Sequence, residues 1–295
     1  MKLSRVLVIV NPASRRGDRV VAAAEKAFNK AGISAEFMMT EAPGHGAQIA
    51  ARLGSSYDAV FTVGGDGTAI EVIGALAHGG PPVGILPGGT GNVIARTLGT
   101  PVNIRKAVDA LLSGDEARID LGLLSTGQRF AIGMGVGLDA TMIANAPAAL
   151  KRRIGFFAYV IGALKAFIKL EQFTVRLTVD GVTREMRASA VLIANFGAVM
   201  NDLLAFGDGI QRDDGMLNAC VYSPRNASDA VRILWRMARK NFKPDPSVYY
   251  QAGSSFQIET IPPRLGQADG ELIGNSPFSV TVEPLAARVL VPRRS

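Results

Sequence analysis

The chain has 295 residues, of which 48% are hydrophobic and 19% are charged, and this composition excludes an intrinsically disordered protein. A single cysteine, Cys220, excludes a disulfide scaffold and a CxxC zinc site, and is typical of a reducing cytosol. The net charge of +7 favours an anionic partner, which could be nucleic acid, a membrane surface or a phosphate-bearing ligand.

The first 116 residues alternate between strand and helix patterns, which predicts a doubly wound α/β domain. Continuous apolar runs such as residues 6–10 are typical of parallel strands that are buried on both faces. The expected strands cover residues 6–10, 35–39, 59–63 and 83–86, and the expected helices cover residues 18–30, 46–53, 68–77, 92–98 and 104–112.

The pattern then changes, and residues 117–286 are predicted to form a second, mostly antiparallel β domain, with the active site in the cleft between the domains. The pair Asp180-Gly181 separates two alternating stretches and predicts a type I′ hairpin turn. The expected strands cover residues 116–124, 128–132, 173–179, 182–186, 191–195, 217–222, 255–260, 278–283 and 288–291, and helical patterns cover residues 147–170 and 228–242. The C-terminal strand, residues 287–295, is a candidate to return to the first domain.

Three turns rich in glycine and small residues follow three of the expected parallel strands, at residues 11–17, 64–68 and 87–92. The carboxyl ends of strands line the ligand crevice of an open α/β sheet, and turns without Cβ atoms let backbone N–H groups approach phosphate oxygens. Each turn alone would suit an ordinary connection, but the three together predict a phosphate-binding crevice.

Several carboxylates lie beside glycines, and phosphoryl transfer needs such groups to hold Mg²⁺ and to deprotonate a hydroxyl. They are Asp66, Asp213 and Asp214 before Gly215, and Asp269 and Glu271 around Gly270, with Asp120 at an expected strand as a further candidate. A carboxylate beside glycine is also an ordinary turn residue, but Asp66 lies inside a loop expected to bind phosphate, so we assign it to phosphate and metal handling. No P-loop motif is present, and residues 133–138 imitate a dinucleotide fingerprint with Leu138 at the third glycine position.

The ordered set of motifs resembles the diacylglycerol kinase catalytic family, the bacterial soluble lipid kinases related to sphingosine and ceramide kinases. The motifs that carry the resemblance are N-P-x-S at 11–14, G-G-D-G-T at 64–68, P-G-G-T-G-N at 87–92, I-D-L-G at 119–122, G-V-G-L-D-A at 135–140, D-G-M-L at 214–217 and D-G-E at 269–271. The G-G-D-G-T element alone is shared with NAD kinases and phosphofructokinases, whereas the ordered set is highly specific.

The resemblance implies residues for ATP, for Mg²⁺ and for proton transfer. The implied ATP contacts are Asn11, Pro12, Ser14, Arg15, Thr40, Gly64, Gly65, Asp66, Gly67, Thr68, Glu71, Gly89, Thr90 and Asn92. Asp214 and the backbone of Gln211 and Met216 would hold the metal. Glu271 would be the proton acceptor, with Asp269 as its competitor, since residues two apart in an extended segment share a face. Ile70 and Val93 stand where the family usually has Asn and often has Asp.

These residues predict an ATP- and Mg²⁺-dependent kinase that phosphorylates the hydroxyl of a diacylglycerol-like, sphingoid or ceramide lipid. A NAD kinase-like enzyme with a soluble acceptor is one alternative. A catalytically inactive nucleotide-binding regulator at the membrane surface is another.

Both expected helices of the second domain carry basic residues beside apolar ones, which predicts peripheral association with an anionic membrane. The basic residues are Lys151, Arg152 and Arg153 in the first helix and Arg232, Arg236, Arg239 and Lys240 in the second. No nucleic-acid-binding motif accompanies them, so no nucleic-acid partner is expected. The longest apolar run, residues 154–164, is too short to span a bilayer, and the N-terminus lacks a signal-peptide pattern, which predicts a cytoplasmic location. The oligomeric state stays open, with a homodimer among the options.

Overall fold

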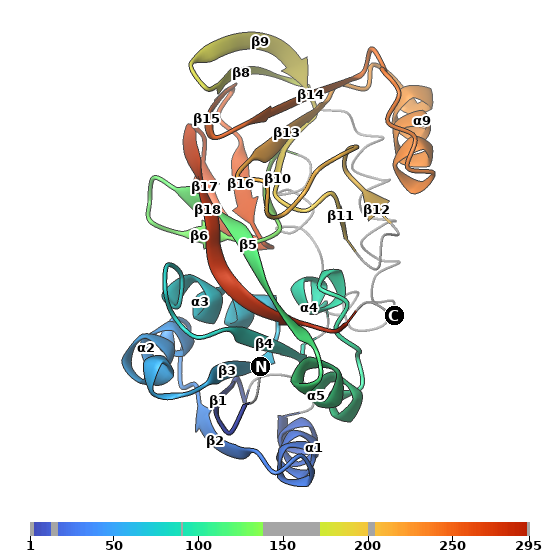
Figure 1. The fold of residues 1–295 in the computed structure, drawn as a ribbon. Helices are drawn as coiled ribbons and strands as arrows, with labels where there is room; N and C mark the ends of the chain where they lie inside the picture. The colour runs from blue at the N-terminus through green and yellow to red at the C-terminus, as the bar shows by residue number, and fades with distance from the viewer. Residues whose placement is uncertain (1–2, 13–16, 90, 138–171, 200–203, 294–295) are drawn as a thin grey trace. The chain divides into compact units, whose positions relative to one another are not determined.

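In the computed structural model the chain forms two compact units, residues 1–119 with 285–295 and residues 120–284. The structure describes residues 3–12, 17–89, 91–137, 172–199 and 204–293 (Figure 1). The expected helix over residues 147–170 therefore lies outside the described residues. Two long strands, β5 (Asp115–Leu124) and β18 (Phe278–Val291), pair with each other and contribute residues to both units.

The first unit contains a parallel sheet in the order β2-β1-β3-β4, so the predicted α/β domain is confirmed. Its strands are β1 (Arg5–Val10), β2 (Ser34–Met39), β3 (Ala59–Gly64) and β4 (Val83–Pro87). The connecting helices are α1 (Gly17–Lys30), α2 (His45–Leu53), α3 (Asp66–Ala75), α4 (Val93–Thr97) and α5 (Ile104–Leu112), with a 3₁₀ turn, η1, at Gly54–Ser56. Helix α1 packs against α5 and α2 against α3, and Figure 1 shows the two pairs on opposite faces of the sheet. The central strands are buried along almost their whole length, because helices cover both faces.

The second unit contains mostly antiparallel strands, as predicted. One sheet continues from β18 through β15 (Ser255–Ile261) and β8 (Phe173–Val179) to β9 (Val182–Ala188). The other has the order β14-β13-β10-β7-β16-β17. Its strands are β7 (Gly133–Gly137), β10 (Ala190–Ala194), β13 (Leu217–Tyr222), β14 (Val248–Gly253), β16 (Leu265–Ala268) and β17 (Glu271–Asn275), and the short strands β6 (Arg129–Phe130), β11 (Ala198–Val199) and β12 (Leu204–Ala205) complete the unit.

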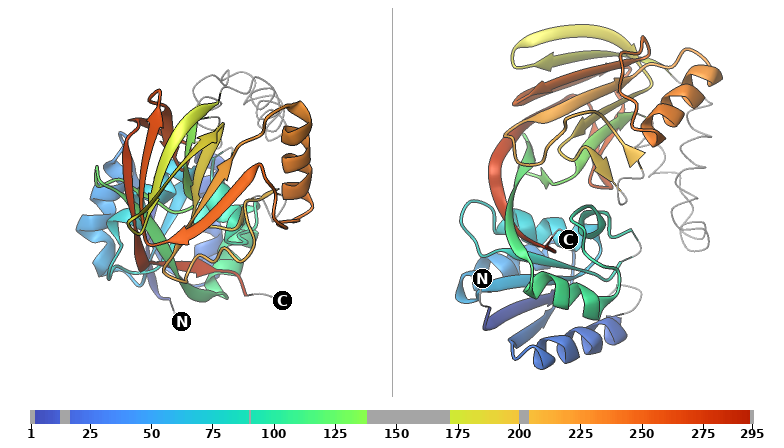
Figure 2. Two further views of the ribbon diagram at one scale, coloured as in Figure 1. Left: turned by 90° about the horizontal axis from the view of Figure 1, so that it is seen from above. Right: turned by 45° about the vertical axis from the view of Figure 1, so that its right-hand side comes forward.

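Alternate residues of β10 and β13 serve two separate hydrophobic clusters. Val191 and Val221 belong to the core that also contains Phe173 and Phe256 of the first sheet. Their neighbours Leu192 and Cys220 face the other way and pack against α9 (Ala227–Ala238), which lies on the outside of the sheet (Figure 2). The two-residue period of a strand therefore explains why both faces of this sheet are apolar.

The observed elements differ from the predicted ones at a few places. Asp180 and Gly181 form the predicted turn, with φ values of 47° and 83°. Residues 278–291 form one continuous strand rather than two. The segment that imitates a dinucleotide fingerprint, residues 133–138, contains strand β7. Within the described part of the chain, no helix is long and apolar enough to cross a membrane.

Candidate active site

Two glycine loops at the carboxyl ends of β3 and β4 interlock through their backbones. The N–H groups of Gly88 and Gly89 both donate to the carbonyl oxygen of Gly64, each at 2.9 Å. A Cβ atom on Gly89 would lie 2.7 Å from the Cα of Gly65, and one on Gly88 would lie 2.9 Å from the nitrogen of Gly64. These positions therefore need glycine because the loops touch each other, whatever ligand they bind.

Asp66 begins α3 directly after this contact and also binds the start of α4. Its Oδ1 accepts the N–H of Ile94 at 2.8 Å, and a Cβ on Gly91 would lie 3.2 Å from its Oδ2. Burial raises the pKa of Asp66, and the N–H groups of Ile94 and Val93 lower it in partial compensation. Asp66 therefore joins α3 to α4, a role that the sequence did not predict.

Two asparagines hold the glycine loops in shape. Asn92 is buried in the left-handed conformation, with φ 49°, and exchanges two hydrogen bonds of 2.8 Å with the backbone of Gly89. Asn11, which follows β1, donates to Thr68 Oγ1 at 3.2 Å. All three predicted loops thus meet around the start of α3, whose N-cap Gly65 has no side-chain cap. An uncapped helix start presents N–H groups that suit an anion such as phosphate.

Two further predicted ATP contacts, Thr40 and Glu71, lie beside the start of α2. Thr40 is buried, and Glu71 Oε1 accepts the N–H of Gly44 at 2.9 Å. A Cβ on Gly46 would lie 2.9 Å from the other Glu71 oxygen and 3.8 Å from Thr40. Glu71 therefore supports the backbone at the start of α2. The predicted contacts Ser14, Arg15 and Thr90 lie outside the described residues.

In the second unit, Asp120 fixes the loop that contains the predicted metal ligands. Its buried carboxylate accepts the N–H of Gly215 at 2.7 Å, and its own N–H donates to the carbonyl of Arg212 at 2.7 Å. Within the loop, Asp214 Oδ1 accepts the N–H of Met216 at 3.0 Å.

This loop offers an exposed carboxylate, Asp214, together with the backbone around Gln211 and Met216. Among the described residues, no cluster of three or more His, Cys, Asp or Glu side chains could hold a metal ion. Mg²⁺ is commonly bound through one or two carboxylates together with water and substrate phosphates. The residues present therefore fit Mg²⁺ better than a metal that needs a closed cage of side chains.

Asp269 and Gly270 form the turn between β16 and β17, and both are left-handed, with φ values of 47° and 92°. The Asp269 carboxylate accepts the N–H groups of residues 131, 132 and 133 at 2.6, 2.9 and 3.0 Å. Glu271 begins β17, is exposed, and pairs with Ala268 across the hairpin. The expectation that Asp269 and Glu271 share a face of an extended segment is wrong, because the chain reverses direction between them.

Asn195 is a buried residue that the sequence analysis missed. Its Nδ2 donates to the carbonyl oxygens of Asp120 and Ala131, both at 2.7 Å, and so connects β5 to the segment that Asp269 holds. Its Oδ1 is buried without a hydrogen-bond partner in the described structure. The only signal in the sequence is a polar residue directly after the apolar run of β10, which is too common a pattern to predict such a role.

Two family models match almost the whole chain. Residues 5–124 match the diacylglycerol kinase catalytic domain. Residues 132–291 match the YegS C-terminal NAD kinase beta sandwich-like domain. The first match contains the interlocked loops, and the second contains Asp214, Asn195 and the Asp269 turn.

Individual relatives agree with these matches. A diacylglycerol kinase of Staphylococcus saprophyticus is 27% identical over 92% of this chain and 90% of its own length. An uncharacterized protein of Synechocystis is 31% identical over 79% of this chain, which spans about half (54%) of that relative. The crystal structure of a putative diacylglycerol kinase from Bacillus anthracis has a TM-score of 0.83 at 25% identity, covering 99% of this chain and 98% of that one.

The interlocked loops can be tested with a pair of glycine substitutions. Gly89→Ala should lower the free energy of unfolding by about 1–3 kcal/mol, because its Cβ would collide with backbone that has little room to move. Gly65→Ala is the matched control in the same contact: its Cβ would lie 3.9 Å from the Cα of Gly89, so stability should stay unchanged or rise by about 0.5 kcal/mol. Urea unfolding measures both variants, and equal stabilities would contradict the described contact.

Asp66 accepts a backbone N–H and carries a buried charge, and two substitutions separate these two properties. Asp66→Ala removes both the charge and the acceptor for the Ile94 N–H, so it should be about 1 kcal/mol less stable than Asp66→Asn. Asp66→Asn keeps an acceptor and removes a buried charge, so it should raise stability at neutral pH.

The advantage of Asp66→Asn should depend on pH. Because burial raises the pKa of Asp66 above the ordinary value of 3.8, the folded protein binds this proton more tightly than the unfolded chain does. The stability that this proton contributes is fully present at a pH below the ordinary pKa of 3.8, and it is lost as the pH rises through the raised pKa of the folded protein. The Asn variant should therefore gain on the wild type between about pH 4 and neutrality, as measured by unfolding at a series of pH values. A difference that does not vary with pH would show that the charge carries no cost.

Proposed function

The chain belongs to the diacylglycerol kinase catalytic family, and on that premise we propose that it transfers the γ-phosphate of ATP to a lipid hydroxyl in a Mg²⁺-dependent reaction. The observation that carries the proposal is the pair of interlocked glycine loops at the uncapped start of α3. Backbone N–H groups held in this way bind phosphate oxygens without having to reorganise, which is the main requirement of phosphoryl transfer. The acceptor we propose is diacylglycerol-like, after the relatives that bear that name.

The nucleotide phosphates would lie against Gly65, Gly67 and Thr68 at the start of α3. Thr68 Oγ1 accepts a hydrogen bond from Asn11, which orients its hydroxyl relative to the loop. Asp214, with the backbone of Gln211 and Met216, would hold Mg²⁺, whose charge offsets that of the phosphate oxygens.

Glu271 is the proposed acceptor of the proton that the lipid hydroxyl releases when its oxygen attacks the γ-phosphorus and the bond to the β–γ bridging oxygen breaks, which releases ADP. The Glu271 carboxylate makes no hydrogen bond to another described residue, whereas the Asp269 carboxylate receives three backbone N–H groups. A carboxylate that is already saturated with donors is a weak base, because protonation would break those bonds. The hydrogen-bond partners therefore favour Glu271 over Asp269 as the base.

Transfer of label from γ-labelled ATP tests the function directly. The protein is incubated with Mg²⁺ and with micelles that contain diacylglycerol, phosphatidylglycerol, ceramide or sphingosine, or with NAD in solution. We expect label in a lipid, and chelation of Mg²⁺ should abolish the transfer. Label in NAD alone would support a NAD kinase-like enzyme, to which the name of the second matching domain points. Thermal stabilisation by ATP without transfer to any acceptor would identify an inactive regulator.

Substitution of Glu271 should mainly lower the rate of catalysis, whereas substitution of Asp269 should mainly lower the stability of the fold. Glu271→Gln should lower kcat about 10²–10⁴-fold, the usual scale for a general base, with little change in the KM for ATP or in stability. Asp269→Ala should destabilise the protein by about 2–4 kcal/mol, because three N–H groups lose a charged acceptor. Steady-state kinetics and urea unfolding of both variants measure these effects. A fully active Glu271→Gln protein would exclude Glu271 as the base.

A further inference from the structure

Helix α9 carries an exposed apolar stripe opposite the face that it buries. Ala230, Ile233 and Met237 pack into the sheet, whereas the side chains of Val231 and Trp235 are 55% and 60% exposed. Val231 and Trp235 are one turn apart and so lie on the same face of the helix. The guanidinium of Arg239, one turn further on, lies 4.5 Å from the centre of the Trp235 ring. We call Val231, Trp235 and Arg239 the outer stripe.

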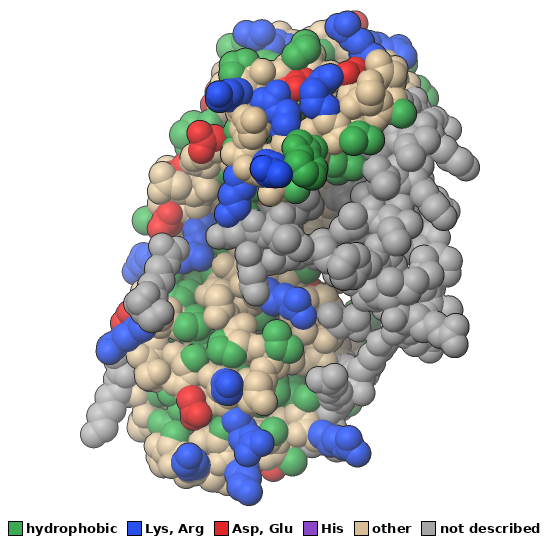
Figure 3. All heavy atoms as spheres, turned by 90° about the vertical axis from the view of Figure 1, so that its right-hand side faces the viewer, with side chains coloured by type: hydrophobic (Ala, Val, Ile, Leu, Met, Phe, Trp, Pro, Cys, Tyr) green, Lys and Arg blue, Asp and Glu red, His purple; other side chains and the backbone are tan. Residues whose placement is uncertain are grey.

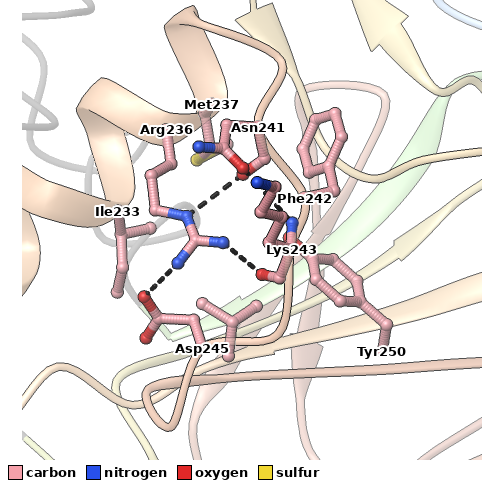
Figure 4. Close-up of a pocket in the computed structure, with 9 residues that line it drawn as sticks. Ile233, Arg236, Met237, Asn241, Phe242, Lys243, Asp245 and Tyr250 are labelled. Atoms are coloured by element: carbon pink, nitrogen blue, oxygen red, sulfur yellow. Dashed lines mark hydrogen bonds and ion pairs between the residues drawn. The ribbon is translucent and has the colours of Figure 1, made fainter.

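Two arginines of α9 that the sequence analysis counted among the membrane-facing residues form ion pairs within the protein. Arg236 Nη1 contacts Asp245 at 2.7 Å, and the same guanidinium donates to the backbone carbonyls of Asn241 and Lys243 (Figure 4). Arg232 contacts Asp229 at 2.6 Å and Asp245 at 3.1 Å. Both arginines therefore bind Asp245 of the loop after α9, and Arg232 also binds Asp229 of α9 itself, so much of their charge is balanced within the protein.

The surface around the outer stripe nevertheless keeps a surplus of positive charge. Arg225, Arg239 and Lys243 are exposed and make no ion pair with any residue that the structure describes, while Asp229 and Asp245 are already paired. Figure 3, which looks onto the side of the second unit that carries α9, shows Lys and Arg side chains around hydrophobic ones. An apolar stripe within a cationic rim is complementary to an anionic phospholipid surface, where charge attracts and apolar groups insert.

We propose that the outer stripe docks the protein on anionic phospholipid bilayers, with the Trp235 ring at the level of the headgroups. The proposal rests on the proposed function, because a diacylglycerol-like acceptor lies in a bilayer. Tryptophan prefers the membrane interface, since its ring is largely apolar and its N–H needs a polar partner. Arg239 would place its charge among the phosphates while its stacking on Trp235 keeps the ring oriented outward. A soluble polyanion would use the charge but would leave Val231 in water.

The chain contains a single tryptophan, so tryptophan emission, excited at a wavelength that tyrosine does not absorb, reports on the outer stripe alone. Full-length protein is mixed with phosphatidylcholine vesicles that contain or lack phosphatidylglycerol. With the anionic vesicles, Trp235 emission should shift to the blue and resist quenching by acrylamide, and high salt should reverse both effects. Sedimentation with the vesicles without a change in emission would mean that another surface docks, and no sedimentation would mean that no surface does. Either result overturns the proposal.

Substitutions then test the stripe itself. Trp235→Ser and Arg239→Gln should each weaken vesicle partitioning, the charge loss by about fivefold. Arg52→Gln is the matched control, because it removes an exposed charge of the same sign from α2 and should leave partitioning almost unchanged. Thermal unfolding checks that the variants are folded. Equal vesicle partitioning of the Arg239→Gln and Arg52→Gln variants would refute docking through the outer stripe, because net charge alone would then explain binding.

Activity on two acceptors separates this inference from the proposed function. The stripe variants should phosphorylate a short-chain, water-soluble diacylglycerol as the wild type does, and should lose activity on long-chain diacylglycerol in anionic vesicles. Equal losses on both acceptors would overturn the docking role. A wild-type protein that gives the Trp235 shift and phosphorylates no lipid would retain the docking surface while the proposed function fails.

Discussion

The carbonyl oxygen of Gly64 accepts two N–H groups from the next loop, and the candidate nucleotide site depends on this shared contact. It brings the ends of β3 and β4 together at a distance that only glycine allows at residues 88 and 89. The Asp66 carboxylate then extends the connection to Ile94 and so sets where α4 begins. Because the proposed phosphate-binding groups are backbone atoms of these same loops, the contact between the loops holds them in position, which would lower the cost of organising the site.

In the second unit, buried polar side chains hold the loops in place, whereas close backbone contacts do so in the first unit. Asn195 joins β5 to the segment that the Asp269 carboxylate holds, and the Asp120 carboxylate holds the loop that contains Asp214. Glu271 follows directly on the Asp269 turn, so one hydrogen-bonded network determines the position of both the proposed base and the proposed metal ligand. Because an unpaired buried polar group is costly, removal of one partner from such a network should be strongly felt, so the network is sensitive to single substitutions.

The sequence predicted the elements whose signals are local and missed those that depend on distant partners. Apolar runs identified the parallel strands, and Asp180-Gly181 identified its hairpin, because period and turn chemistry act over a few residues. Strands β16 and β17 escaped prediction because they are short and their register shifts between Gly266 and Gln267. The donors to Asp269 lie more than 130 residues away in the chain, and Asp245 meets Arg232 and Arg236 only after the loop folds back. The sequence shows which residues are charged, but a local pattern cannot show which distant residue pairs with each charge.

The carboxylates beside glycines, which look alike in the sequence, differ in how many of their oxygens the fold already uses. Asp269 accepts three N–H groups and Asp120 fixes the Gly215 backbone, so both serve the scaffold. Asp66 accepts the N–H of Ile94 and Asp214 accepts the N–H of Met216, so backbone donors orient both carboxylates. Glu271 makes no such bond within the described structure and is exposed. A carboxylate whose lone pairs already hold the fold together is poorly suited to accept a proton during catalysis, and this is why we propose Glu271, and not Asp269, as the base.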